Sequence, residues 1–109
     1  MGFSLGNYEC YQKKFQIVVI DDHKLVRENT VNLIRNVFKY LKINDYGILE
    51  GSDGVDLLNI VRLDKENKIK YIFIDENMYY LNGSEAVSIV RKFEEYKKIN
   101  RYEIINYRI

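Results

Sequence analysis

Short apolar runs alternate along this chain with longer segments in which apolar residues recur at helical spacing. The runs are FQIVVI (15–20), YGILEG (46–51), IKYIFI (69–74) and YEIINY (102–107), and their β-branched and aromatic residues favour strands. Strands that alternate with helices favour parallel pairing, because each helix carries the chain back across the sheet through a right-handed crossover. The order therefore predicts an α/β fold built on a parallel sheet.

Each segment between the runs carries a helix signal of its own. Between His23 and Lys42, residues at helical spacing form one face, namely Val26, Thr30, Leu33, Ile34, Val37, Phe38 and Leu41. Ser52 or Asp53 offers an N-cap for a second helix. Asn82, with Glu85 three residues later, resembles a capping box at the start of a third.

The length and charge of the chain limit the classes of protein to which it can belong. With 109 residues, of which 47% are hydrophobic, the chain suits one domain with a modest core. The net charge is +1, so there is no basic field to attract nucleic acid. Residues 1–14 are mixed and polar and are expected to be a leader or linker, and residues 15–109 are expected to form the domain.

Signals of the cellular compartment are sparse. Cys10 is the single cysteine, so an internal disulfide is excluded and a free thiol in a reducing compartment is expected. No apolar run approaches the ~20 residues that a membrane-spanning helix needs. No targeting signal is recognisable at the start of the chain. We therefore expect a cytoplasmic protein that binds neither membrane nor nucleic acid.

Acidic side chains follow two of the expected strands where each strand ends. Asp21 and Asp22 come directly after the first strand, and Asp75 comes directly after the third. Binding sites in open parallel sheets form beyond the carboxyl ends of the strands, which lie ~4.8 Å apart. If these strands are neighbours, the three carboxylates converge and raise one another's pKa values unless a cation lies among them. Mg²⁺, which binds through a few carboxylates and several waters, suits such a pocket.

Each acidic site taken alone has a simpler interpretation, because aspartate after a strand often forms a turn or caps a helix. Asp22 would then cap the first helix, and Asp75 would begin a turn. The two sites together, in this strand order, favour the metal pocket. His23 follows the acid pair, but it is the only histidine. We expect it to be a surface residue rather than a metal ligand.

Three separated motifs, IVVIDDHKLVREN, EGSDGVDLL and YIFIDENMYYLNGSEAVSIV, resemble the receiver domain of two-component response regulators. The resemblance covers about residues 15 to 107. It implies a flavodoxin-like three-layer sandwich with strand order 2-1-3-4-5. It also implies a phosphorelay, in which a histidine kinase or histidine phosphotransfer protein passes a phosphoryl group to this domain.

The resemblance assigns roles to individual residues. Asp75 would be the phosphoacceptor. The implied Mg²⁺ site consists of Asp21, Asp22, Asp75 and the backbone carbonyl of Asn77, with Asp21 acting through a metal-bound water. Gly83 would open the third helix.

The chain departs from the family pattern in its third loop and at its end. Tyr79 follows Met78 where the family usually has proline, so this loop should be freer. Arg108 falls at or near the position of the family's Ser or Thr, and no lysine follows Lys98 to bridge the phosphoryl group. A fifth strand is missing. We therefore expect a fold truncated to about four strands and three helices, belonging either to a fragment of a longer protein or to a degenerate receiver.

The expected function is that of a phosphoacceptor receiver domain, phosphorylated on Asp75 with Mg²⁺, and not that of a metabolic enzyme. The alternative is a degenerate pseudo-receiver, a protein-interaction module that keeps the acids but does not switch. A phosphatase of the haloacid-dehalogenase type is disfavoured, because Asn77 stands where that family has its second aspartate. No glycine-rich dinucleotide motif follows the first strand.

The missing elements have a structural consequence. The fourth strand would be an exposed edge, and such an edge invites self-association with a second copy. One sheet face would be covered by the first helix alone. Parts of FQIVVI and YIFI would then be incompletely covered.

Overall fold

The computed structural model describes residues 10, 12–97 and 101–108. Its strands are β1 (Phe15–Ile20), β2 (Tyr46–Gly51), β3 (Ile69–Asp75) and β4 (Glu103–Tyr107). Its helices are α2 (Lys24–Tyr40), α3 (Gly54–Arg62) and α4 (Gly83–Lys97). The strands pair in parallel in the order β2-β1-β3-β4. This confirms the predicted α/β flavodoxin-like fold and the strand order implied for its first four strands.

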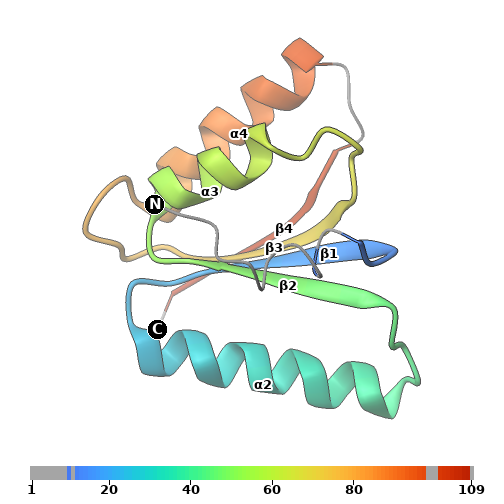
Figure 1. Cartoon of the computed structure of the whole chain (residues 1–109). Helices are drawn as coiled ribbons and strands as arrows, with labels where there is room; N and C mark the ends of the chain where they lie inside the picture. The colour runs from blue at the N-terminus through green and yellow to red at the C-terminus, as the bar shows by residue number, and fades with distance from the viewer. Residues whose placement is uncertain (1–9, 11, 98–100, 109) are drawn as a thin grey trace.

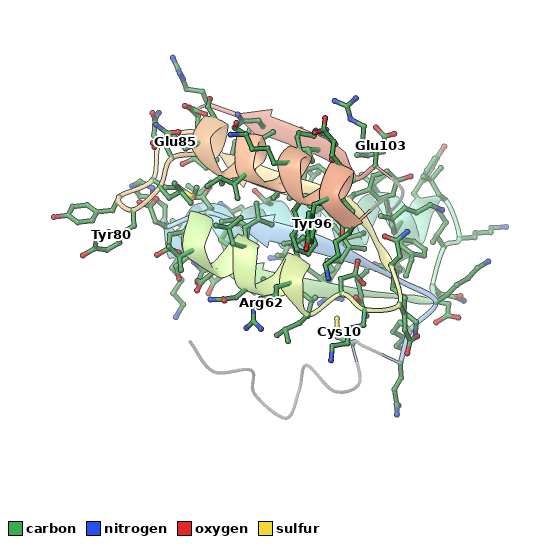
Figure 2. All side chains as sticks on the ribbon, turned by 90° about the horizontal axis from the view of Figure 1, so that it is seen from above. Cys10, Arg62, Tyr80, Glu85, Tyr96 and Glu103 are labelled. Carbon is green, nitrogen blue, oxygen red and sulfur yellow. The ribbon has the colours of Figure 1, made fainter. Side chains whose placement is uncertain are left out.

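The fold has three layers, with α2 on one face of the sheet and α3 and α4 on the other (Figure 1). Seen from above, α3 and α4 lie side by side over the sheet (Figure 2). Successive side chains of β1 point to opposite faces of the sheet. Ile17 and Val19 pack in the cluster under α2, while Val18 and Ile20 pack in the cluster under α3 and α4. Burial on both faces explains why β1 is a continuous apolar run rather than an alternating one.

Two of the helices begin at the predicted caps. Asp53 is the N-cap of α3, and its side chain accepts a hydrogen bond of 2.9 Å from the backbone N–H of Asp56. Before α4, the N–H of Asn82 donates to Oε1 of Glu85 at 3.2 Å, and the N–H of Glu85 donates to Oδ1 of Asn82 at 2.9 Å. This reciprocal pair confirms the capping box, which satisfies two donors that the first helical turn would otherwise leave free.

The orientation of α2 differs from the predicted apolar face. Ile34 is buried as expected and Val31 is buried as well, but Leu33 and Val37 are 64% and 45% exposed. Within the described part of the chain, α2 is the single helix on its side of the sheet. Apolar side chains on its flanks therefore meet no neighbouring helix, and helical spacing alone did not distinguish them from the buried ones.

Cover on the α2 side becomes thinner from β1 toward β4. Ile17 and Val19 of β1 are fully buried, and only Phe15 at the start of this strand is half-buried, so the incomplete cover expected for part of FQIVVI is limited to its first residue. Tyr71 and Phe73 of β3 are half-buried, as expected for YIFI, and Ile105 of β4 is 40% exposed. The reason is the strand order: β1 lies inside the sheet beneath α2, whereas β4 lies at the edge.

The start of β4 is tied to the rest of the molecule by polar contacts. The N–H of Tyr102 donates to Oε2 of the buried Glu94 at 2.6 Å, and its phenol donates to Oδ2 of Asp64 at 3.1 Å. Nη1 of Arg91 donates to the carbonyl of Tyr102 at 2.9 Å and also pairs with Glu94. These bonds hold the start of the edge strand in place, together with the packing of Tyr102 and Ile104 against the core under α3 and α4.

Most of the expected leader lies outside the described residues, which include Cys10 and residues 12–14 of it. Cys10 is a free, buried thiol in the cluster under α3 and α4. Nε2 of Gln16 donates to its carbonyl at 3.1 Å, and a Cβ on Gly47 would collide with its Sγ. Burial raises the pKa of the Cys10 thiol to about 11. No helix in the described ranges has the length and apolarity to cross a membrane.

Candidate metal centre

The carboxyl ends of β1 and β3 lie next to each other, because the two strands pair in parallel. Asp21 follows β1 directly, and Asp75 is the last residue of β3. Asp21, Asp22, His23 and Asp75 each offer one ligand atom, and these atoms all lie within 4.8 Å of one another. The structure thus brings together the three carboxylates predicted to converge. It adds the imidazole of His23, which sequence reasoning placed on the surface.

A cavity of about 290 Å³ opens at this end of the sheet. Its lining residues are Asp21, His23, Val26, Asp75 and Asn77. Asn77, whose carbonyl the resemblance assigns to the metal, is therefore in the wall of the same cavity. Asp21 and Asp75 face a shared space large enough for an ion with its water ligands, and Asp22 lies outside the lining.

Asp75 is a buried acid with one oxygen that lacks a hydrogen-bond partner in the described part of the chain. It is 5% exposed, and its Oδ1 has no hydrogen-bond partner among the described residues. Burial is the main cause that raises the pKa of Asp75, and the charges of Asp21 and Asp22 add to it. The backbone amides of Asn77 and Glu76 lower that pKa and offset the rise in part. A buried carboxylate oxygen without a donor is unfavourable, and a bound cation would compensate it.

Asp21 differs from Asp75 in that both of its oxygens already accept hydrogen bonds. Its Oδ1 accepts from the N–H of His23 at 2.9 Å, and its Oδ2 accepts from the hydroxyl of Tyr107 at 2.7 Å. A carboxylate held in this way has less freedom to ligate an ion directly. This geometry fits the expectation that Asp21 acts through a metal-bound water.

Tyr107 is the residue of the site that sequence reasoning missed. It lies 86 positions from Asp21 and belongs to no recognised motif. The register of β3 and β4 places it opposite Asp75, which carries its phenol to the acids. No local pattern contains that information, because the contact depends on the pairing of two strands separated by a helix.

Asp22 is more exposed than the other acids and connects two loops. Its Oδ2 accepts a hydrogen bond of 3.2 Å from the N–H of Tyr79, and its Oδ1 lies 3.1 Å from Nδ1 of His23. Asp22 does not cap α2, whose N-cap residue is His23. The alternative interpretation of Asp22 as a helix cap is therefore wrong.

The loop after Asp75 is held by its first residue, Glu76. Oε1 of Glu76 accepts from the N–H and the hydroxyl of Ser84, each at 2.7 Å, and from Nδ2 of Asn106 at 3.1 Å. The Ser84 hydroxyl and then the Asn106 amide lower the pKa of Glu76. Gly83 opens α4 as expected, and a Cβ there would collide with the carbonyl oxygen of Asp75. These contacts connect the end of β3 to both α4 and β4.

Two tyrosines stand at the outer side of this loop. The rings of Tyr79 and Tyr80 are exposed and meet edge to face, with centroids 4.8 Å apart. Tyr80 projects away from the body of the molecule (Figure 2). The aromatic pair lies beside the acids without entering the cavity, whose lining includes neither ring.

The donor atoms fit a hard divalent cation. Three carboxylates and a backbone carbonyl are oxygen ligands of the kind that Mg²⁺ prefers, and Mg²⁺ keeps several waters, for which the cavity has space. The unpartnered Oδ1 of Asp75 is the observation that most directly favours such a charge.

Comparison with known sequences finds similarity to a transcriptional regulator. No protein-family model matches the chain. The transcriptional regulatory protein DegU of Brevibacillus brevis is 29% identical over 92 residues, which are 84% of this chain. The match spans 36% of that relative's length, so the chain corresponds to about a third of DegU.

Solved structures share the fold at low sequence identity. The receiver domain of the histidine kinase CKI1 from Arabidopsis thaliana, complexed with Mg²⁺ and BeF₃⁻, has a TM-score of 0.71 and 19% identity over 94% of this chain and 71% of that chain. A chain in the co-crystal structure of the Saccharomyces cerevisiae histidine phosphotransfer signaling protein Ypd1 and the receiver domain of the response regulator Ssk1 has a TM-score of 0.59 and 18% identity, and the match covers 88% of this chain and 63% of that chain. The resemblance predicted from the three motifs is confirmed: the chain has the α/β flavodoxin-like fold of a response-regulator receiver domain.

Proposed function

We propose that this chain is a phosphoacceptor receiver domain of a phosphorelay, with Asp75 as the phosphorylated residue and Mg²⁺ as its ion. The observation that carries the proposal is the buried, unpartnered Oδ1 of Asp75 at the centre of the acidic cluster. The receiver-domain fold and the sequence similarity to DegU support it.

The metal would be held by Asp22, Asp75 and the carbonyl of Asn77, with Asp21 holding a metal-bound water. When bound, Mg²⁺ supplies the positive charge that offsets repulsion between the Asp75 carboxylate and the phosphoryl oxygens. The residues of the chain hold the acids and the loop after Asp75 in position. Tyr107 and the N–H of His23 hold Asp21, while Ser84 and Asn106 hold Glu76 at the base of the loop.

In the proposed transfer, a carboxylate oxygen of Asp75 forms a bond to the phosphorus of a phosphohistidine. The bond from phosphorus to the donor nitrogen breaks, its electron pair stays on the leaving imidazole, and an acyl phosphate remains on Asp75. The partner would be a histidine kinase or a histidine phosphotransfer protein. The similarity to a chain of the Ypd1–Ssk1 complex supports a partner of this class. The catalysis of this chain would be limited to its own phosphorylation and dephosphorylation.

A pseudo-receiver is the second candidate, and the end of β4 favours it. Tyr107 ends that strand and Arg108 follows it, where the family resemblance leads us to expect Ser or Thr. The phenol of Tyr107 already occupies one oxygen of Asp21. A chain of this kind would keep the acids as part of a protein-interaction module without a phosphorylation switch.

Intact mass spectrometry separates the two candidates. The chain is incubated with Mg²⁺ and acetyl phosphate or phosphoramidate, alongside Asp75→Asn and the matched control Asp45→Asn at an exposed position. A receiver gains one phosphoryl group that Asp45→Asn retains and Asp75→Asn loses. Modification that persists in Asp75→Asn contradicts the assignment, and the absence of any modification supports the pseudo-receiver.

Metal binding is measured separately by calorimetric titration with Mg²⁺. Asp22→Ala removes one proposed ligand and should reduce the affinity for Mg²⁺ by at least about tenfold. Glu95→Ala removes an exposed carboxylate of α4 and should leave the affinity unchanged. Equal Mg²⁺ binding by Asp22→Ala and the parent chain would show that the carboxylates do not form a metal site.

A further inference from the structure

His23 is the N-cap residue of α2, yet its side chain makes no capping hydrogen bond. An N-cap side chain ordinarily accepts a hydrogen bond from a backbone N–H in the first helical turn. The ring of His23 is directed instead at the acids, with Nδ1 3.1 Å from Oδ1 of Asp22 and 3.7 Å from Oδ1 of Asp21. The ring also lines the cavity that Asp75 lines.

We propose that His23 is a nitrogen ligand of this metal centre, and that it increases the affinity for first-row transition ions such as Ni²⁺ and Co²⁺ without increasing the affinity for Mg²⁺. The inference rests on the metal pocket of the proposed function and adds a ligand and an ion class to it. Its two independent supports are the position of the imidazole within the cluster and the buried, unpartnered Oδ1 of Asp75.

The positions of the donor atoms favour a mixed oxygen and nitrogen site. Both oxygens of Asp21 accept hydrogen bonds, so its direct contribution to an ion is reduced. Oδ1 of Asp75 has no partner, and Oδ1 of Asp22 faces the imidazole. An ion between Asp22 and Asp75 would lie where Nδ1 of His23 now faces Oδ1 of Asp22. When the ring proton is on Nε2, Nδ1 has a free lone pair, and this lone pair would point to the ion.

The chemical preferences of the ions explain the expected selectivity. Imidazole suits Ni²⁺, Co²⁺ and Zn²⁺, whereas Mg²⁺ takes oxygen ligands and retains its waters. Removing the imidazole therefore takes one protein ligand away from a bound transition ion. Mg²⁺ would not use this ligand, so its affinity should not change. The ring is 72% exposed, so it can move onto an ion without rearrangement of the core.

Calorimetric titration with Ni²⁺ and with Mg²⁺ tests this selectivity. His23→Ala should reduce the affinity for Ni²⁺ by at least about tenfold and change that for Mg²⁺ by less than about twofold. Lys24→Ala, at the next and equally exposed position, is the matched control and should change neither. Thermal melts of the metal-free variants verify that both are folded.

A spectroscopic measurement identifies the ligand directly. The chain has one histidine, so an imidazole nitrogen coupled to a bound Mn²⁺ in electron spin echo envelope modulation must belong to His23 in a protein without a tag. The nitrogen modulation should be present in the parent chain and in Lys24→Ala, and absent in His23→Ala.

The outcomes distinguish this inference from the proposed function. If His23→Ala binds Ni²⁺ as the parent does, or loses Ni²⁺ and Mg²⁺ affinity equally, His23 is not a selective ligand and the inference fails alone. If Asp22→Ala also retains Mg²⁺ affinity, the metal pocket fails, and the proposed function loses its ion. Nitrogen modulation that persists in His23→Ala would likewise overturn the inference.

Discussion

The phenol of Tyr107 donates a hydrogen bond of 2.7 Å to Oδ2 of Asp21, which joins the end of β4 to the acid that follows β1. Strand β3 lies between these two strands, and its last residue, Asp75, is the register partner of Tyr107. Burial, followed by the hydrogen bond to Asp21, raises the pKa of Tyr107. The phenol therefore stays protonated and remains a donor. This bond couples the position of β4 to the geometry of the acids.

Tyr107→Phe should destabilise the metal-free chain by about 1–2 kcal/mol, because Oδ2 of the buried Asp21 loses its donor while the ring keeps its packing. Urea denaturation measures the difference in the free energy of unfolding. Saturating Mg²⁺ should reduce the difference in the free energy of unfolding between Tyr107→Phe and the parent chain, since a bound cation compensates the negative charge of the Asp21 carboxylate. Tyr96→Phe removes an exposed hydroxyl and is the matched control. An equal effect of the two substitutions would show that the bond to Asp21 contributes nothing to stability.

Asp75→Asn should stabilise the metal-free chain near neutral pH. The pKa of Asp75 in the folded chain is raised above its ordinary value of 3.8, chiefly by burial. As pH rises from 3.8 through the raised pKa, the unfolded chain ionises this group first, and the folded chain loses stability relative to it. Asparagine does not ionise, so the variant does not lose this part of its folding stability as pH rises.

Thermal melts test this expectation at about pH 7 and about pH 4. The melting temperature of Asp75→Asn should exceed that of the parent chain by about 4 °C or more at the higher pH, a shift that about 1 kcal/mol produces in a domain of this size. The difference should shrink at the lower pH. Mg²⁺ should stabilise the parent chain more than the variant. A variant that melts below the parent at both pH values would show that the Asp75 charge is already compensated.

Cys10 should react slowly with thiol reagents while the chain is folded. Burial raises the pKa of its thiol from 9.0 to about 11, which reduces the thiolate fraction at neutral pH by about 100-fold, and the thiolate is the reactive form. Alkylation by iodoacetamide, followed by mass spectrometry, should be at least about 100-fold slower in buffer than in concentrated urea. Similar rates under the two conditions would show that Cys10 does not pack against the core.

The edge of β4 should support self-association of the isolated chain. β4 pairs only with β3 in the described sheet, and Ile105 on this strand is 40% exposed. An exposed edge with an apolar side chain can pair with the edge of a second copy. Size-exclusion chromatography with light scattering should show a mass that rises with concentration.

Two lysine substitutions test whether association uses this edge. Ile105→Lys should restore the monomer, because a charge on an edge strand opposes pairing. Ile89→Lys, at a 42% exposed position of α4, changes a comparable apolar side chain away from the edge and should leave association intact. A parent chain that is monomeric at every concentration would contradict the expected interface.

Features that depend on neighbouring residues could be predicted from the amino-acid sequence. The apolar runs located all four strands, since β-branched and aromatic residues favour strands, and in β1 burial on both faces adds a continuous hydrophobic signal. Asn82 and Glu85 located the start of α4, because a capping box needs only a spacing of three residues. The positions of Asp21 and Asp75 at strand ends were sufficient to predict their convergence, given parallel pairing.

Contacts between residues that are far apart in the sequence depend on how the elements pack. Tyr107 meets Asp21 only because β4 pairs with β3 in one register, and a shift of one residue would turn the phenol to the other face. Helical spacing could not rank Val31 above Leu33 for burial, because the rotation of α2 is set by the sheet beneath it. The ring of His23 turns to the acids rather than to the first turn of its helix. Asp75 joins these acids only because β3 pairs with β1 in parallel, which brings together the ends of two strands far apart in the sequence.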